Sequence, residues 1–236
     1  MSFDNEIICK SKHIPIVVIC YNNLTFVKNF VSQLLRFPNP IIIMDNCSTY
    51  PPMKIYYDNI QKEIGDRITI HRFNTNYGHN VYKIRGDLLP NQFIISDPDL
   101  LLHPDMPINM SDILLALSDA YGASKVGTAL DLSDRDKFVD CPNYHNQNNI
   151  YQHEIQFWSY RIQYPKLELY RAAIDTTFCL VNRDKAGFPI RIAGNFTAKH
   201  LPWYKDYIKN NVPIEEIEYW KQNNISSSIL FTCLCL

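Results

Sequence analysis

Two aspartates on either side of a proline are the clearest chemical feature of this sequence. The apolar run Phe93–Ser96 is followed directly by Asp97, Pro98 and Asp99. Carboxylates at positions i and i+2 of an extended turn can lie on the same side of the chain, where they repel each other unless a cation lies between them. Mg²⁺ and Mn²⁺ prefer oxygen ligands and commonly leave positions for a substrate's phosphates. The pair therefore suggests a divalent cation site; the alternative is a solvated turn with Asp97 capping and Asp99 exposed.

The elements that must position this pair alternate over the first hundred residues. We predict strands at 13–20, 41–44, 67–72 and 92–96, which are short runs rich in apolar, β-branched residues. Helices are predicted between them, from Asn22 or Asn23 to Pro38, from Pro51 to Gly65, and at 79–85. This alternation predicts an α/β fold with a mostly parallel central sheet flanked by helices.

Polar residues follow each of the four predicted strands. The polar groups are Tyr21–Asn22, Asp45–Asn46, Asn74–Gly78 and Asp97–Asp99. In open parallel sheets, ligands bind at the carboxyl ends of the strands. We therefore place the site at the edge of the sheet where these four groups converge.

The second half of the chain is less regular. Its predicted elements are a helix at 111–121, a strand at 125–130, a loop-like stretch at 134–163, a strand at 172–181, a polar-aromatic loop at 195–204, and a last helix opened by Pro213 with Ile214, Ile217 and Trp220 on one face. Aromatic rings stack on the C–H surfaces of sugars, so Trp203 and Tyr204 favour an acceptor groove, with ordinary packing as the alternative.

Taken in order, these motifs resemble those of the GT-A-fold nucleotide-sugar glycosyltransferases. The sequence is most similar to a family-2-like group of small enzymes from bacteria and large DNA viruses, which also carry segments like 173–178 and 197–204. The resemblance extends from Pro15 to Trp220. It implies a single GT-A domain over 1–236, with a Rossmann-like nucleotide-sugar-binding half at about 13–100, a less regular acceptor-side half at about 101–225, and a tail at 226–236.

The resemblance also implies which residues bind the donor. Tyr21, Asn22 and Asp45 would hold the nucleoside, with an Asx-turn as the alternative role of Asp45. Asn76 and Gly78 would approach the donor, and Arg85 could pair with a phosphate. In this group the basic residue is often followed by Asn, whereas here Gly86 follows it. Lys199 could meet a phosphate oxygen as a point charge.

The implied metal ligands are Asp97, Asp99 and His200, which would hold Mn²⁺ or Mg²⁺. Neutral imidazole is a good Mn²⁺ ligand, and a surface histidine without a partner is the alternative for His200. The general base of an inverting enzyme would be Asp175, with Asp140 and Glu168 as alternatives and turn capping as the non-catalytic role of Asp175. A retaining enzyme would need no such base, and we leave that choice open.

The resemblance implies a metal-dependent transfer of a hexosyl or deoxyhexosyl group from a UDP-sugar to an acceptor hydroxyl on a glycan, a lipid or a protein-linked group. One alternative is a sugar-nucleotide pyrophosphorylase-like nucleotidyltransferase. That class would need a glycine-rich phosphate loop, and the segment Cys20–Thr25 has no glycine. Another is a non-catalytic carbohydrate-binding or scaffold domain, which would have no need for paired carboxylates.

The net charge and the hydropathy of the sequence bear on two other classes of protein, those that bind nucleic acids and those that span a membrane. Lys and Arg total 23 and Asp and Glu total 24, so the net charge of −1 disfavours nucleic-acid binding. We expect no transmembrane segment, because no run of about 18 apolar residues occurs. The 7 cysteines form no CxxC pair, which favours a cytoplasmic location, or one peripheral to membranes through the apolar tail. The sequence does not indicate an oligomeric state.

Overall fold

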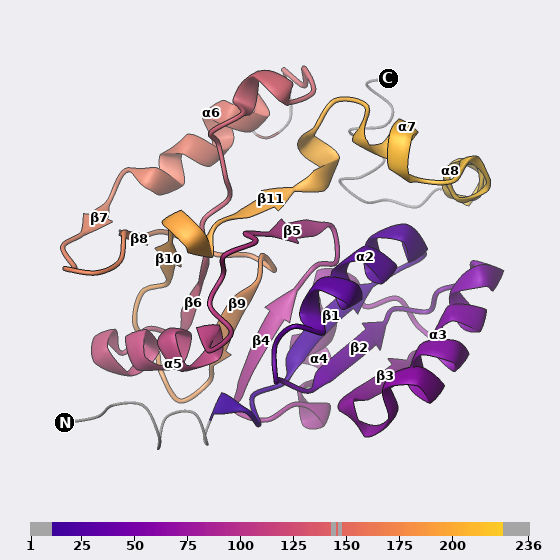
Figure 1. The fold of residues 1–236 in the computed structure, drawn as a ribbon, viewed down its shortest axis with the longest axis horizontal. Coiled ribbons are helices and arrows are strands. Elements are labelled where there is room, and N and C mark those ends of the chain that lie inside the picture. Colours follow the sequence, from indigo (N-terminus) through magenta and orange to yellow (C-terminus); the bar gives the residue numbers. More distant parts are fainter. Residues whose placement is uncertain (1–10, 143–144, 146–147, 224–236) are drawn as a thin grey trace.

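The computed structural model of the chain describes residues 11–142, 145 and 148–223. Its centre is a nine-stranded sheet with the order β3-β2-β1-β4-β9-β6-β10-β8-β7 (Figure 1). The strands are β1 (Ile16–Cys20), β2 (Ile41–Asp45), β3 (Ile68–Arg72), β4 (Gln92–Ser96), β6 (Lys125–Thr128), β7 (Arg161–Ile162), β8 (Leu169–Arg171), β9 (Cys179–Asn182) and β10 (Ile190–Ile192). Only β9 and β8 run opposite to the other strands of this sheet. The predicted mostly parallel sheet is confirmed.

The first half forms the regular part of the sheet. All residues of β1 are buried, which explains why its sequence is apolar without alternation. The first two predicted helices are α2 (Leu24–Leu34) and α3 (Pro51–Ile64), and α3 begins with proline at its first position and ends at Gly65. The predicted short helix is α4 (Val81–Ile84). The strands and helices predicted here are confirmed, with small differences at their ends.

The two faces of the sheet are covered differently. Ile16 and Val18 of β1 face a large apolar cluster that includes residues of α2, α3 and α5 (Met110–Tyr121). Val17 and Ile19 point to the other face, into a smaller cluster with α4. In Figure 1, α2, α3 and α5 lie in front of the sheet and α4 lies behind it.

The second half differs from the sequence prediction at several points. Residues 134–163 contain α6 (Ile150–Ile155) and β7 in place of a continuous loop. The strand predicted at 172–181 is wrong over its first part, since only β9 is extended there. The last helices are α7 (Tyr207–Asn211) and α8 (Ile214–Gln222). In α8, Trp220 is buried as expected, but Ile214 is 58% exposed and does not share its face.

A second, two-stranded sheet crosses the ends of the large one. It pairs β5 (Leu100–Leu102), directly after the aspartate pair, with β11 (Ala198–His200) in antiparallel register. Both strands lie in segments for which no strand was predicted, because three residues carry too little periodicity to be recognised. This small sheet brings the late segment of the chain onto the aspartate pair.

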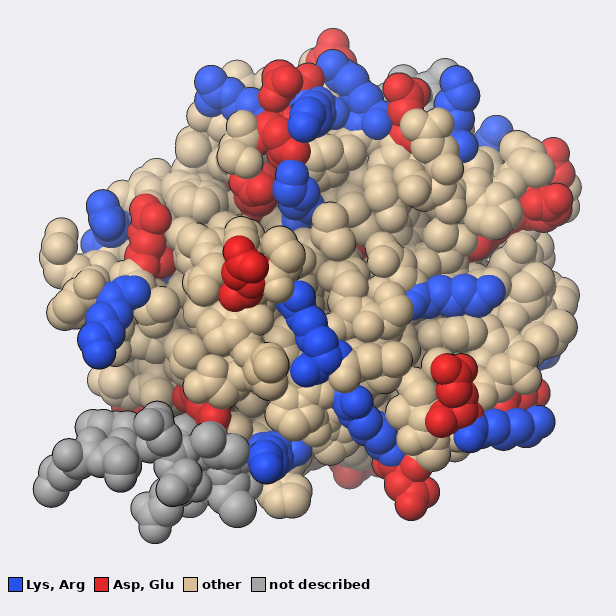
Figure 2. Space-filling view, viewed as in Figure 1, with Lys and Arg blue, Asp and Glu red and all other residues tan. Residues whose placement is uncertain are grey.

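No helix in the described part of the chain has the length and apolar character needed to cross a membrane. The predicted tail at 226–236 lies outside the described residues. The face of the molecule seen in Figure 2 carries acidic and basic side chains side by side, without a large patch of one sign.

Candidate active site

The carboxyl ends of β1 and β4 open into a cleft of about 460 Å³. The lining includes the predicted site residues Tyr21, Asn76, Gly78, Asp97, Asp99 and Asp175, together with Ile19, Cys20, Asn23, Asn46, His79, Pro98 and Thr176. Six residues named from the sequence therefore meet at one place. They come from four separate segments, as expected for ligand sites at the ends of parallel strands.

Asp97 and Asp99 occupy the centre of this cleft. Asp97 is partly buried and accepts a hydrogen bond from the hydroxyl of Thr176, and its own N–H donates to the Thr176 carbonyl oxygen at 2.8 Å. Burial raises the pKa of Asp97, and the nearby Asp99 and Asp175 carboxylates raise it further, whereas the Thr176 hydroxyl lowers it. The neighbouring carboxylates therefore oppose the ionisation of Asp97, which a cation between them would relieve.

His200 lies beside Asp99 because of the β5–β11 register. His200 pairs with Leu100 across the small sheet, and the N–H of Leu201 donates to the Asp99 carbonyl oxygen at 2.9 Å. The imidazole Nε2 is 3.4 Å from Asp99 Oδ2, with both side chains largely buried. Burial lowers the pKa of His200, with the Asp99 carboxylate acting against this shift. The imidazole is thus favoured in its neutral form, in which it can ligate a metal.

The side chains around Asp99 include two buried polar atoms that a cation could use. Asp99 Oδ1 and His200 Nδ1 are both buried without a hydrogen-bond partner. Buried polar atoms are normally paired, so an unpaired carboxylate oxygen points to a ligand that would complete it. Within the described ranges, no three His, Cys, Asp or Glu side chains form a ready-made metal cluster. The residues fit a cation that takes some of its ligands from a bound phosphate.

Asp175 lies in the irregular segment 173–178, whose backbone carbonyl groups each accept a hydrogen bond from another part of the chain. Its carboxylate is exposed to the cleft, while its carbonyl oxygen is held by Lys125. Arg191 Nε donates to the carbonyl oxygen of residue 173 at 2.8 Å, and Lys125 Nζ donates to those of residues 174 and 175 at 2.9 Å each. Asp97 N donates to the carbonyl oxygen of residue 176 at 2.8 Å. Thr128 Oγ1 donates to that of residue 177 at 3.4 Å, and Thr128 N to that of residue 178 at 3.2 Å. The backbone under Asp175 is thereby fixed without belonging to a strand.

Arg191 is itself held by a buried partner. Its guanidinium pairs with Glu154 of α6, and both side chains are almost fully buried. Burial raises the pKa of Glu154 to about 7, although Arg191 favours the charged form. Since α6 lies in the stretch predicted to be a loop, the sequence offered no sign of this contact.

Asn22 shapes the loop after β1 but does not line the cleft. It is fully buried with a positive φ of 52°, and its side-chain oxygen accepts from the N–H groups of Thr49 and Tyr50 at 2.8 and 2.9 Å. The indole N–H of Trp220 donates to its carbonyl oxygen. These contacts leave Tyr21, the preceding residue, at the wall of the cleft.

Asp45 is also placed behind the cleft. Its Oδ1 accepts from the N–H of Ser48 at 3.0 Å, which is the turn-forming contact of the alternative interpretation. Burial raises its pKa, whereas the Ser48 hydrogen bonds lower it. The neighbouring Asn46, expected at this edge as part of the polar group Asp45–Asn46, holds the loop at 74–78: its amide donates to the Gly78 carbonyl oxygen at 3.1 Å and its Oδ1 accepts from Tyr77 N at 3.3 Å.

The structure does not bring Lys199 and Arg85 to the cleft. Successive side chains of a strand point to opposite sides, so Lys199 points away from the His200 side and pairs with Asp134 at 2.6 Å. Arg85 pairs with Asp87 at 3.3 Å, which raises the pKa of the guanidinium.

The two alternative bases also lie elsewhere. Asp140 is exposed and does not line the cleft. Glu168 accepts a hydrogen bond from Tyr170 in the outer part of the sheet. Of the three carboxylates considered from the sequence, only Asp175 reaches the cleft.

Comparisons with known proteins were made on sequence and on structure. No protein-family model matches the chain, and no curated protein matches its sequence. Among solved structures, the chain is similar to GalNAc-T7 with UDP, GalNAc and Mn²⁺, with a TM-score of 0.56 and 11% identity over 80% of this chain and 43% of that chain. Weaker likenesses are to the mannosyltransferase PcManGT from Pyrobaculum calidifontis in complex with GDP-Man and Mn²⁺ (TM-score 0.42, 13% identity, 52% of this chain and 36% of that one) and to TarS from S. aureus (TM-score 0.38, 14% identity, 50% and 22%).

The likeness to GalNAc-T7 shows the fold. The chain has the GT-A type of fold, as the sequence resemblance predicted. It spans less than half the length of each of these three solved chains. At 11% identity the activity of that protein does not transfer with its fold, and any function has to be argued from the cleft itself.

Proposed function

We propose that this protein is a glycosyltransferase that moves a hexosyl or deoxyhexosyl group from a UDP-sugar to an acceptor hydroxyl, with Mn²⁺ or Mg²⁺. The observation that carries the proposal is the meeting of Asp97, Asp99, His200 and Asp175 at the carboxyl end of β4, where Asp99 and His200 keep buried, unpartnered atoms. The GT-A fold supports it, since the GalNAc-T7 structure that shares this fold holds UDP and Mn²⁺.

The cation and the donor would share the cleft. Asp97, Asp99 and His200 would hold the cation, which when bound neutralises the charge of the diphosphate leaving group. The nucleoside end would lie against Tyr21 and the loop of Asn76 and Gly78, all of which line the cleft. We omit Asn22, Asp45, Arg85 and Lys199 from direct donor contact, since none of them lines this cleft.

Asp175 is proposed as the general base. Its exposed carboxylate faces the cleft, and the hydrogen bonds along 173–178 fix the backbone that carries it. In this reaction the acceptor oxygen bonds to the anomeric carbon while the bond from that carbon to the diphosphate breaks. UDP leaves with the electron pair, and the acceptor proton moves to Asp175. This assignment makes the transfer inverting.

Titration calorimetry tests the proposal against its rivals. We expect UDP to bind with Mn²⁺ present and to bind at least about tenfold more weakly without it, because the diphosphate supplies ligands to the cation. Tighter binding of a nucleoside triphosphate than of UDP would favour a nucleotidyltransferase. A UDP-sugar hydrolysis screen with Mn²⁺ then tests catalysis, and absence of hydrolysis for all donors despite UDP binding would favour a non-catalytic domain.

A further inference from the structure

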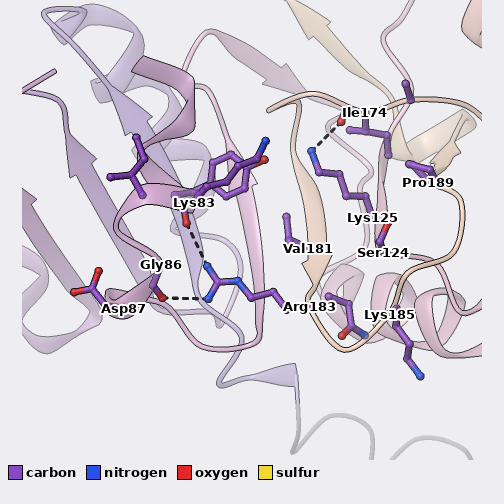
Figure 3. Close-up of a pocket in the computed structure, with 14 residues that line it drawn as sticks. Lys83, Gly86, Asp87, Ser124, Lys125, Ile174, Val181, Arg183, Lys185 and Pro189 are labelled. Atoms are coloured by element: carbon purple, nitrogen blue, oxygen red, sulfur yellow. Dashed lines mark hydrogen bonds between the residues drawn. The ribbon is translucent and has the colours of Figure 1, made fainter. Parts of the chain in front are cut away.

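A second cavity, which we call the rear cavity, lies on the face of the sheet that carries α4. It measures about 770 Å³ and is lined by residues of α4, β6, the segment at 173–174 and the end of β9 (Figure 3). Its apolar walls are Ile84, Ile174, Val181 and Pro189. None of these residues lines the cleft of the proposed donor site, so the rear cavity is a separate space.

Three cations of the rear cavity are not neutralised by the protein. Lys83, Lys125 and Arg183 line it, and among the described residues none of the three has a carboxylate within ion-pair distance. Arg183 donates to the carbonyl oxygens of Tyr82 and Gly86 at 3.2 and 3.1 Å, and Lys125 donates to two carbonyl oxygens. These neutral acceptors hold the side chains in place but leave their charge uncompensated.

The other charged residues of the lining are already paired. Lys185 lies 3.0 Å from Asp119, and Asp87, the one carboxylate of the lining, lies 3.3 Å from Arg85. In Figure 3 the Arg183 side chain turns toward Gly86. The rear cavity therefore carries an excess of positive charge, in contrast to the mixed surface of the face in Figure 2.

The rear cavity and the cleft share one wall. Ala173 and Ile174 line the rear cavity, while Asp175 and Thr176, the next two residues, line the cleft. Lys125 donates to the carbonyl oxygens of Ile174 and Asp175 at 2.9 Å each, and Figure 3 shows it turned toward Ile174. A molecule anchored in the rear cavity would therefore lie one segment of backbone away from the proposed base.

We propose that the rear cavity binds a phosphate monoester, and that this group belongs to the acceptor. The proposal rests on the proposed function, since only a transferase has an acceptor. A phosphate monoester carries close to two negative charges near neutral pH, which would offset the uncompensated positive charge that Lys83, Lys125 and Arg183 bring to the lining. The apolar walls would receive the part of the acceptor next to its phosphate, which is either a sugar ring or a lipid chain, while the reacting hydroxyl would lie beyond this wall, at Asp175 in the cleft.

Calorimetry at low ionic strength, without donor or Mn²⁺, tests the site. The probes are glucose 6-phosphate, octyl phosphate and, as the neutral control, methyl glucoside. We expect at least one phosphate probe to bind and methyl glucoside not to bind. Tighter binding of glucose 6-phosphate identifies a sugar phosphate, and tighter binding of octyl phosphate identifies a lipid phosphate. If neither phosphate probe binds, or if methyl glucoside binds equally well, the proposal is wrong.

Charge reversal locates the binding. We expect Lys83→Glu to raise the Kd of the bound phosphate about tenfold, because one favourable charge is replaced by an unfavourable one. Lys62→Glu, an exposed lysine on α3, is the matched control and should leave the Kd unchanged. The milder Lys83→Ala serves if the reversed charge disturbs folding, which thermal unfolding would reveal. An unchanged Kd in both Lys83 variants would place the phosphate elsewhere and overturn the proposal.

The same measurements separate the two proposals. Phosphate binding that responds to Lys83, without any UDP binding in the presence of Mn²⁺, would retain the rear cavity as a site and contradict the glycosyltransferase. Metal-dependent UDP binding without binding of either phosphate probe would do the reverse.

Discussion

Residues 16–99 place Asp97 and Asp99 through strand pairing, whereas residues 100–222 place Asp175 and His200 by means of short strands and single side chains. In the first half, Ile94–Ser96 of β4 pair with β1, which is itself paired along its whole length with β2, and the aspartates follow directly. In the second half, Asp175 depends on Lys125 and on the contacts of its neighbours, and His200 on a three-residue pairing.

Because the two halves position their site residues differently, substitutions in the first half should mainly lower stability and substitutions in the second half should mainly lower activity. A defect in the first half removes apolar packing that is spread over many residues, so it should lower stability before it moves the aspartates. A defect in the second half can remove one of the few side chains that hold a catalytic segment, with little loss of packing. We therefore expect substitutions in the two halves to change different measured quantities.

The largest effect is expected for Asp99→Ala. If Asp99 holds the cation, donor hydrolysis with Mn²⁺ should fall at least about a thousandfold, because cation stabilisation contributes several kcal/mol to such a reaction. Stability should not fall, since a buried carboxylate oxygen without a partner is removed. Asp66→Ala, an exposed aspartate of the same half, is the control. Near-normal hydrolysis at saturating Mn²⁺ would refute the assignment.

The second-largest effect is expected for Asp175→Asn. Removal of a general base lowers kcat by about 10²- to 10⁴-fold, and UDP affinity should barely change because the amide is close in shape to the carboxylate. Steady-state kinetics and UDP calorimetry measure the two quantities. Asp140→Asn and Glu168→Gln, which alter carboxylates outside the cleft, should retain activity. An equal loss of UDP affinity in Asp175→Asn would move this residue from proton transfer to donor binding.

Lys125→Met tests whether a single side chain positions the segment of Asp175. We expect kcat for donor hydrolysis to fall about ten- to a hundredfold, since a small misplacement of a catalytic group has effects of this size. UDP affinity with Mn²⁺ should be unchanged, because Lys125 does not line the cleft. Lys125→Arg keeps a donor for the two carbonyl groups and should recover part of the loss. A purely structural lysine would instead lower stability and leave kcat per folded molecule intact.

His200→Ala should have a smaller effect, confined to the metal. The Mn²⁺ concentration for half-maximal hydrolysis should rise about tenfold, with the rate at saturating Mn²⁺ largely retained, because two carboxylates would remain. His103→Ala, just beyond the other end of β5, is the control and should leave the Mn²⁺ dependence unchanged. The same Mn²⁺ dependence in His200→Ala as in the parent would exclude it as a ligand.

The smallest effect is expected for a substitution in the core of the first half. Ile43→Val removes one methylene group from a fully buried side chain of strand β2 and should lower the free energy of unfolding by about 1 kcal/mol. Hydrolysis per folded molecule should stay the same. Ile55→Val on α3, where the side chain is 62% exposed, should change neither quantity. A loss of activity in Ile43→Val without a loss of stability would contradict the comparison between the halves.

The same difference explains what could be predicted from the sequence. The first-half strands are runs of five residues, most of them buried on both faces, so their apolar pattern marks them directly. The strands β7, β8 and β10 have two or three residues each, and their existence depends on partners far along the chain. No local pattern predicts α6 as the partner of Arg191, because that contact joins residues 37 positions apart.

The residues of the candidate site also fall into two groups, those that could be named from the sequence and those that could not. Asp97, Asp99, Asp175 and His200 could be named from the sequence because their side chains have the chemistry that the resemblance implies. Thr176 and Lys125 were missed, since their contacts are with a neighbouring site residue or with backbone groups. Lys199 was named for its charge, but the alternation along β11 determines where that charge lies.

The register of β5 and β11 also bears on which insertions and deletions the gene can tolerate. One codon gained or lost in a surface loop, such as the stretch between β7 and β8, shifts only that loop. One codon gained or lost within 198–200 reverses the sides on which the side chains of this strand point. A codon gained before Lys199 would place Lys199 against Asp99 in place of His200, so that an ammonium group would occupy the place proposed for the cation. The number of residues in this three-residue strand therefore decides whether the proposed site can form.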